Sequence, residues 1–68
     1  MTKELLPHQQ RVVDEQTELE GKLKALREFI RLNRVFDTLP SEERTLLKTQ
    51  MDLMSAYSNV LGLRIARF

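Results

Sequence analysis

Apolar residues recur along the first half of the chain with spacings of three, four or seven positions, which place them on one face of an α-helix. The positions in this series are Leu5, Val12, Leu19, Leu23, Leu26 and Ile30. Pro7 suits the first turn of such a helix, where its missing N–H would have no partner. The pattern predicts a helix over about residues 7–32 that packs against another helix along this face.

The segment NRVFDTLPSEER interrupts the helical pattern. Asn33 suits the end of the first helix. Pro40 and Ser41 suit the start of a second helix, because the two glutamates that follow would lie at its positive N-terminal end. We therefore predict a connection over residues 33–40 and a second helix over about 41–66.

The second helix carries two neighbouring stripes, which together span a wider apolar arc than one partner helix can cover. The first stripe consists of Leu47, Met51, Met54, Leu61, Ile65 and Phe68, and only Ser58 interrupts it. The second stripe consists of Leu46, Gln50, Leu53, Tyr57, Val60 and Arg64. One stripe can face the first helix, which leaves the other for a further partner.

These elements predict an all-α fold, a single domain over residues 1–68 in which a short connection makes an antiparallel two-helix hairpin. Two helices cannot enclose a core by themselves. We therefore expect the hairpin to complete its core by homo-oligomerisation, as a four-helix-bundle dimer or a higher assembly.

Composition excludes several kinds of site and partner. The 68 residues include no cysteine and one histidine, so a disulfide framework, a thiolate metal site and a histidine cluster are excluded. The 11 Lys and Arg residues nearly balance 10 Asp and Glu residues, whereas nucleic-acid binders usually show a basic excess. No apolar run approaches the ~20 residues that span a bilayer, and no signal-peptide core is present. We expect a soluble cytoplasmic protein with no membrane partner, and nucleic acid is disfavoured as a partner.

Polar residues stand where helix packing favours apolar ones, namely at Gln9, Gln16 and Gln50. Such glutamines can set the register between subunits, as buried polar residues do in coiled coils. Gly21 has two interpretations. It either marks the close approach of a neighbour or is a tolerated weak position that costs about 1 kcal/mol relative to alanine.

In an antiparallel hairpin the start of the first helix lies beside the end of the second. This brings together a set of side chains that could hold a small nucleotide: His8, Arg11, Lys22, Tyr57 and Arg64. A guanidinium binds phosphate oxygens in pairs, a lysine adds a point charge, and a tyrosine or histidine ring offers a face to a base. A solvated face accounts for the same residues, with ion pairs such as Arg11–Glu15 and Glu18–Lys22 contributing about 0.2–0.5 kcal/mol each.

Catalytic motifs are missing from the sequence. It contains no glycine-rich phosphate loop, no Ser/His/Asp arrangement and no zinc-protease spacing. His8 and Glu15 would lie about 10 Å apart along one helix, which is too far for direct acid–base cooperation. We expect a protein that is not an enzyme and that needs neither a cofactor nor a metal ion.

The strings HQQRVVDEQTEL, GKLKALREFI and VFDTLPSEERTLLKTQMDLMSAYSNVLGLRI resemble a family of small phage and prophage proteins of the kind first found through a crAss-like phage. The resemblance covers residues 7–68. Its characteristic residues are His8, Gln9, Arg11, Val12, Glu15, Glu18, Leu19, Lys22, Phe36, Leu39, Gln50, Met54, Tyr57, Leu61, Arg64 and Ile65. The resemblance implies a helical hairpin.

The expected hairpin is also similar to phage sponge proteins that inhibit CBASS and Thoeris immunity. Those proteins assemble from short helices and sequester cyclic dinucleotides or cyclic ADP-ribose-type signals at subunit interfaces. The similarity implies a counter-defence protein in the host cytoplasm that binds such a signal without cleaving it. It assigns phosphate contacts to Arg11, Lys22 and Arg64, and base or ribose contacts to His8 and Tyr57. Glu15 would accept from a ribose hydroxyl or orient Arg11.

Two other functions remain open at this point. The hairpin could be an interaction module that docks on a host or phage protein through the stripe around Leu46, Leu53 and Val60. It could also be a small DNA-binding regulator that uses the basic residues between positions 22 and 34, although the near-neutral charge of the chain disfavours that function.

Overall fold

The computed structural model describes residues 4–68 and contains three helices: α1 (Pro7–Leu32), α2 (Arg34–Thr38) and α3 (Ser41–Ala66). No strand occurs between residues 4 and 68, so the all-α prediction is confirmed. The short helix α2 occupies most of the connection, for which the sequence predicted no helix. Residues 1–3 of the predicted domain lie outside the described residues.

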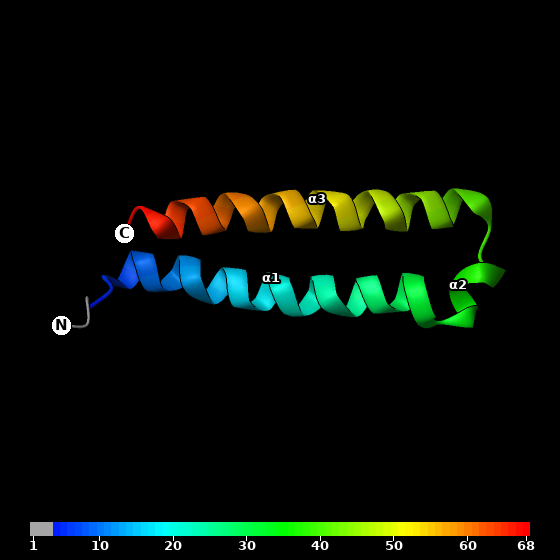
Figure 1. The fold of residues 1–68 in the computed structure, drawn as a ribbon, viewed down its shortest axis with the longest axis horizontal. Helices are drawn as coiled ribbons and strands as arrows, with labels where there is room; N and C mark the ends of the chain where they lie inside the picture. The colour runs from blue at the N-terminus through cyan, green and yellow to red at the C-terminus, as the bar shows by residue number, and fades with distance from the viewer. Residues whose placement is uncertain (1–3) are drawn as a thin grey trace.

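The two long helices lie side by side and run in opposite directions (Figure 1). Helix α2 joins them at one end of the pair, and both termini lie at the other end (Figure 1). The Cα atoms extend over 51 × 16 × 15 Å. This arrangement sets the N-terminal half of α1 beside the C-terminal half of α3, where the candidate site residues occur. In the part of the chain that the structure describes, no helix is long and apolar enough to cross a membrane.

Local hydrogen bonds explain where the helices begin. The Leu6 N–H donates to the Gln9 side-chain oxygen at 2.9 Å, and Pro7 provides the first residue of α1. At the start of α2, the Asn33 side-chain oxygen accepts from the Val35 N–H at 2.9 Å. Because Gln9 satisfies a backbone group of its own helix end, it is accounted for without any role between subunits.

The core is a narrow seam between the two long helices. The buried side chains are Val12 and Leu23 of α1, Phe36 of α2, and Ser58 and Leu61 of α3. Half-buried residues extend the seam with the spacing of about 3.5 residues that is typical of coiled coils. Phe36 closes one end, because its ring meets the Phe29 ring edge-on at 6.1 Å between centroids.

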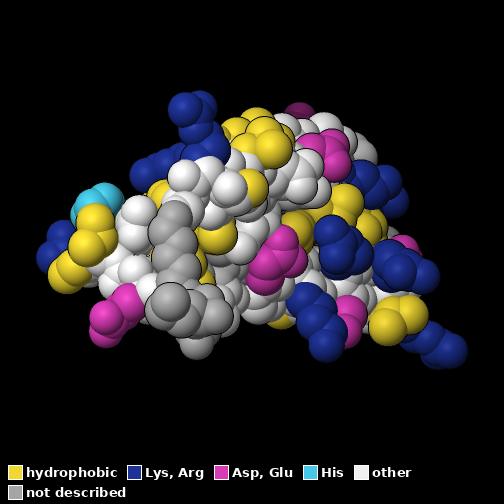
Figure 2. Space-filling view, turned by 60° about the vertical axis from the view of Figure 1, so that its left-hand side comes forward, with side chains coloured by type: hydrophobic (Ala, Val, Ile, Leu, Met, Phe, Trp, Pro, Cys, Tyr) yellow, Lys and Arg dark blue, Asp and Glu magenta, His cyan; other side chains and the backbone are white. Residues whose placement is uncertain are grey.

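The second stripe of α3 remains uncovered. Its apolar members are substantially exposed, by 64% at Leu46, 66% at Leu53, 46% at Tyr57 and 52% at Val60. Figure 2 shows hydrophobic side chains at the surface between charged ones. Exposed apolar residues that form a continuous stripe, unlike single scattered ones, are typical of an interaction surface.

The two glycines have different surroundings. A Cβ atom added at Gly21 would meet no neighbouring heavy atom within 4 Å. Within one chain nothing approaches Gly21, which agrees with the tolerated weak position. A Cβ atom added at Gly62 would lie 3.2 Å from the Gln16 side-chain nitrogen, so it is Gly62 that permits a close approach.

Candidate functional site

A hydrogen bond between the two long helices defines one side of the molecule. The Tyr57 hydroxyl of α3 donates to the Glu15 carboxylate of α1. Residues three, four or seven positions from Glu15 share its face of α1, and they include His8, Arg11 and Lys22. Arg64 lies seven residues from Tyr57 and shares its face of α3. The six predicted site residues therefore lie along one side of the helix pair, which we call the candidate face.

A shallow hollow lies at the centre of the candidate face. Its volume is about 250 Å³, and its lining residues are Glu15, Glu18, Leu19, Lys22 and Tyr57. Ligand pockets usually measure about 300–1,000 Å³ and bury most of the ligand surface. The hollow of one chain is therefore large enough to hold only part of a nucleotide.

The electrostatic environment keeps a proton on Tyr57. The hydrogen bond to the Glu15 carboxylate, assisted by desolvation and by the Glu15 charge, raises the pKa of Tyr57 above its usual value. The positive charge of Arg64 opposes this shift, which indicates that Arg64 lies close enough to influence the phenol. At neutral pH, Tyr57 is therefore a hydrogen-bond donor.

The remaining three predicted residues lie nearer the termini. His8 is exposed in the first turn of α1, Arg11 is exposed one turn later, and Arg64 is exposed in the last turn of α3. None of them lines the central hollow. The candidate face thus has two carboxylates, a phenol and a lysine at its centre, and a histidine and two arginines towards the end that carries the termini.

Sequence reasoning missed a polar layer beneath the candidate face. The Gln16 side-chain N–H donates to the Ser58 carbonyl at 3.1 Å, and the Ser58 hydroxyl donates to the Glu20 carboxylate. Ser58 is only 2% exposed. One signal was present in the sequence: Gln16 and Ser58 each interrupt the apolar seam of their helix, and the two positions are opposite each other in the folded pair.

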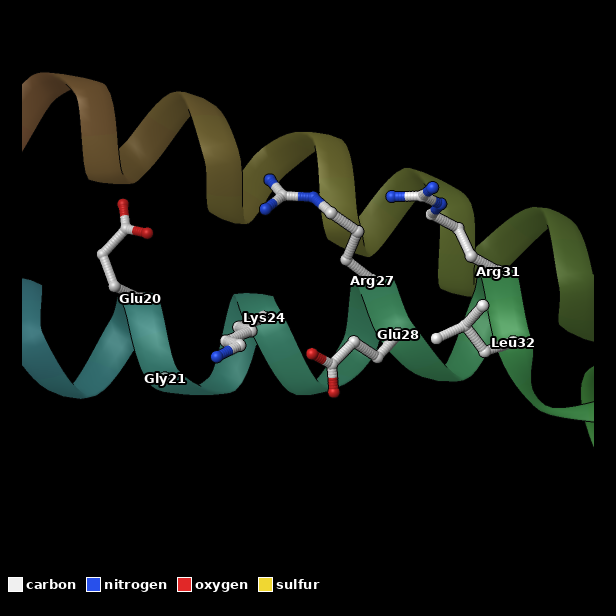
Figure 3. A pocket seen from close by; sticks show the side chains of 7 residues that line it. All are labelled: Glu20, Gly21, Lys24, Arg27, Glu28, Arg31 and Leu32. Atoms are coloured by element: carbon white, nitrogen blue, oxygen red, sulfur yellow. The ribbon is translucent and has the colours of Figure 1, made fainter.

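A larger hollow of about 610 Å³ lies elsewhere on α1 (Figure 3), and its lining residues are Glu20, Gly21, Lys24, Arg27, Glu28, Arg31 and Leu32. Figure 3 shows Arg27 and Arg31 extending towards α3, whereas Lys24 and Glu28 lie along α1. None of the six predicted residues contributes to it. Its three cations and two carboxylates belong to one helix at mostly three- and four-residue spacings, which is typical of a solvated, charge-balanced face.

This hollow also bears on the DNA-binding hypothesis. Lys22 lines the small central hollow, whereas Lys24, Arg27 and Arg31 line the larger one. The basic residues between positions 22 and 34 are therefore divided between different sides of α1. On the side that holds Lys24, Arg27 and Arg31, Glu20 and Glu28 line the same hollow and offset part of the positive charge.

The candidate face combines the cations Arg11, Lys22 and Arg64 with the carboxylates Glu15 and Glu18 at its centre. Within residues 4–68, no group of three or more His, Asp or Glu side chains is placed to hold a metal ion. Arginine and lysine bind phosphate oxygens, and an exposed phenol can stack on a base or donate to it. The face therefore has groups that can contact phosphate and groups that repel it.

Comparison with known proteins gives one match. A family model described as Sequestin matches residues 6–67, a range that includes both long helices and all six residues of the candidate face. No curated protein and no solved structure matches the chain. The description of the family indicates a sequestering role.

Proposed function

The chain belongs to the Sequestin family, and we propose that it binds and sequesters a nucleotide-derived immune signal without cleaving it, as a phage counter-defence protein. The family description supports the sequestering part of this proposal. The nucleotide part rests on the Tyr57–Glu15 hydrogen bond, which gathers the basic and aromatic residues of two helices on one side of the molecule. The proposed ligand class is a cyclic dinucleotide or a cyclic ADP-ribose-type signal.

The residues of the candidate face match the parts of such a ligand. Arg11, Lys22 and Arg64 supply positive charge for the phosphate groups. Tyr57 is 46% exposed, so its ring is accessible to a base. His8 offers a second ring near the termini. The chemistry needed is recognition alone, and the proposal assigns no bond-breaking step to any residue.

We propose that the helical hairpin binds this ligand as a homodimer. The exposed residues Leu46, Leu53 and Val60 continue the helical stripe that contains Tyr57 and Arg64. A second copy packed on this stripe would form a four-helix bundle and remove apolar surface from water, which stabilises by roughly 1.5–3 kcal/mol for each fully buried side chain. The same contact would place the central hollows of two chains at one junction, where they could enclose a ligand.

Retention of added nucleotides tests the proposal. Purified protein is mixed with cyclic dinucleotides or cyclic ADP-ribose derivatives, separated from free nucleotide, and analysed by native mass spectrometry. We expect a defined oligomer that carries one of these compounds, and heat denaturation should release the compound with unchanged mass. Failure to retain any compound of either class, or release of a cleaved product, would contradict the proposal.

A matched pair of variants locates the binding face. Arg11→Ala removes a cation from the candidate face, and Arg27→Ala removes one from a different side of the same helix. We expect Arg11→Ala to lower affinity by at least about tenfold, because a hydrogen bond to a charged group contributes roughly 1.5–3 kcal/mol. Arg27→Ala should bind like the wild type. Equal losses in both variants would indicate general charge attraction and not a site.

The exposed stripe also supports a second candidate function, docking on a host or phage protein. This alternative predicts a monomer that retains no nucleotide and whose Leu53 surface stays accessible to a partner. A stable oligomer in which Leu53 is protected from solvent would remove its main support. Native mass spectrometry of the wild-type protein therefore distinguishes the two functions.

A further inference from the structure

Three polar side chains cross the seam at one level. The Gln16 amide of α1 donates to the Ser58 carbonyl of α3 at 3.1 Å, and the Ser58 hydroxyl donates to the Glu20 carboxylate of α1. Ser58 is 2% exposed and Gln16 is half-buried. The contact between the two helices is otherwise made largely by leucine, valine, isoleucine and methionine.

Such a layer distinguishes one alignment of the helices from the others. Apolar side chains of similar size can replace one another when one helix slides along the other by a heptad. A slide of seven residues would set Gln16 against Met51 or Ile65 in place of Ser58. It would take the half-buried Gln16 amide away from the space that Gly62 leaves beside the Ser58 carbonyl. It would also separate the buried Ser58 hydroxyl from the Glu20 carboxylate, at a cost of about 1–3 kcal/mol. The polar layer therefore favours a single register.

The shape of the backbone agrees with this role. A Cβ atom at position 62 would lie 3.2 Å from the Gln16 side-chain nitrogen. Gly62 follows Ser58 by one helical turn, so its missing side chain leaves room for the amide beside the carbonyl that it binds. Glycine at this position is explained by the polar layer, whereas Gly21 has no neighbouring atom to accommodate.

The register set by this layer determines which residues meet on the candidate face. Glu15 precedes Gln16, and Tyr57 precedes Ser58. When Gln16 meets Ser58, the preceding residues meet each other on the adjoining side, where Tyr57 donates to Glu15. A slide by one heptad would displace Tyr57 by about 10 Å along the pair and separate it from Glu15.

We propose that Gln16, Ser58 and Glu20 are positioning residues that lock the helix register and thereby assemble the candidate face, with Gly62 making room for the lock. Their importance for ligand binding rests on the proposed function. The juxtaposition of Glu15 and Tyr57 does not, because it can be measured without any ligand.

The chain itself supplies the probe for this measurement. Tyr57 is the single tyrosine and the sequence has no tryptophan, so the absorbance of tyrosinate on alkaline titration reports on Tyr57 alone. Gln16→Met keeps the side-chain volume and removes the amide. In this variant we expect the midpoint pH of the Tyr57 titration to fall towards the midpoint pH measured in Glu15→Gln. Glu15→Gln removes the charged acceptor directly and gives the reference value. The helix content and unfolding midpoint of Gln16→Met should be retained or raised, because an apolar residue suits the seam.

A second measurement determines the alignment of the two long helices from the distance between two spin labels. The sequence has no cysteine, so spin labels on Thr17→Cys and Asn59→Cys, both at exposed positions, would be unique. At high dilution in the monomer-favouring background of Leu53→Lys, we expect one narrow distance when Gln16 is present. With Gln16→Met we expect a broadened or second, longer distance, because a slide of one heptad offsets the two labels by about 10 Å along the helix axes.

Two controls keep the outcome decisive. Glu20→Gln retains an acceptor for the Ser58 hydroxyl and should leave the Tyr57 midpoint unchanged, whereas Glu20→Ala should lower it. If Gln16→Met does not fold, Ser58→Ala tests the other bond of the lock, because it removes the hydroxyl that donates to Glu20 and keeps the carbonyl that Gln16 binds. A Tyr57 midpoint and label distance identical to wild type in the folded variant would overturn the proposal. Absence of nucleotide retention by the wild type would refute the proposed function and leave this inference standing.

Discussion

Tyr57 links the stability of the folded chain to pH through its hydrogen bond with Glu15. The bond raises the pKa of Tyr57 above its ordinary value of 10.0 in the folded state. The protonated phenol is therefore favoured by folding. The stabilisation from this hydrogen bond is fully present at pH values below the pKa of Tyr57 in the unfolded chain. It is lost as the pH rises through the pKa of Tyr57 in the folded chain.

We predict that this contribution disappears in strongly alkaline solution. Urea unfolding of wild type and Tyr57→Phe is compared between pH 8 and pH 11. The difference in unfolding free energy between the two proteins should be constant up to about pH 9 and should decrease above about pH 10. Comparison with Tyr57→Phe cancels the titration of lysines that both proteins share. A difference that does not change with pH would show that the phenol is not bonded to Glu15.

The surroundings of the two glycines predict different effects on stability when each is replaced by alanine. Gly21→Ala should raise the free energy of unfolding by about 1 kcal/mol, because alanine favours the helix and meets no neighbour. For a chain of this size, the midpoint of thermal unfolding should rise by about 4–8 °C. Gly62→Ala should gain less or lose stability, because its methyl group would press on Gln16. Equal stabilisation by both substitutions would contradict the close approach at Gly62.

The glutamines show how far residue-level prediction can extend. Gln9 bonds the backbone N–H of Leu6, Gln16 bonds Ser58 across the seam, and Gln50 is exposed with its amide 3.9 Å from the Met54 sulfur. All three stand at positions where the helical pattern favours apolar residues. The sequence alone therefore suggests the same role for each of them, which is to set the register between subunits. Their separate roles depend on which backbone or side-chain group the folded chain places within reach.

At the scale of whole elements, the long helices were predictable and the short one was not. Apolar spacing, Pro7 and Pro40 were sufficient to expect helices over 7–32 and 41–66, because these signals are local. Helix α2 depends on Asn33, whose side chain bonds the Val35 N–H, and on the burial of Phe36 against Phe29. The second of these requires the folded pair of helices, so a local pattern could not reveal it.

The narrow seam between the long helices predicts different results for a buried leucine of α3 and an exposed leucine of α1. Leu61 is 0% exposed, and Leu61→Ala should cost about 2–5 kcal/mol. A chain this short rarely has more than about 3–5 kcal/mol of stability, so this variant should be largely unfolded at 25 °C. Leu32→Ala, at a position 75% exposed in α1, should change stability by less than about 0.5 kcal/mol. Circular dichroism during urea unfolding measures both, and similar losses would contradict the seam.

At the scale of the molecule, the candidate face and the open stripe occupy the same side of the helix pair. Tyr57 belongs to both, because it bonds Glu15 and also lies between Leu53 and Val60 in the helical spacing of α3. The sequence already places Tyr57 and Arg64 in both sets. That Glu15 and Lys22 of α1 lie on the same side follows from the register of α1 against α3, which helical spacing alone does not determine.

Because the candidate face and the open stripe share Tyr57, we predict that a substitution in the stripe abolishes both dimer assembly and ligand binding. Leu53 and Leu63 both lie on α3 and are 66% and 70% exposed, but only Leu53 belongs to the open stripe. Sedimentation of the wild type should give a mass of about 16 kDa, twice the 8.0 kDa of one chain, as a two-fold dimer requires. Leu53→Lys should sediment as one chain, because a buried lysine without a partner is costly, and should retain no nucleotide.

Leu63→Lys is the matched control, because it introduces the same charge on the same helix outside the stripe. It should remain a dimer and bind nucleotide like the wild type. If Leu53→Lys is monomeric yet binds with full affinity, the hollow of one chain is sufficient and the second copy does not complete the site. If the wild type itself sediments at 8.0 kDa with nucleotide bound, the stripe is free for another partner. The masses and affinities of these three proteins therefore separate assembly from recognition.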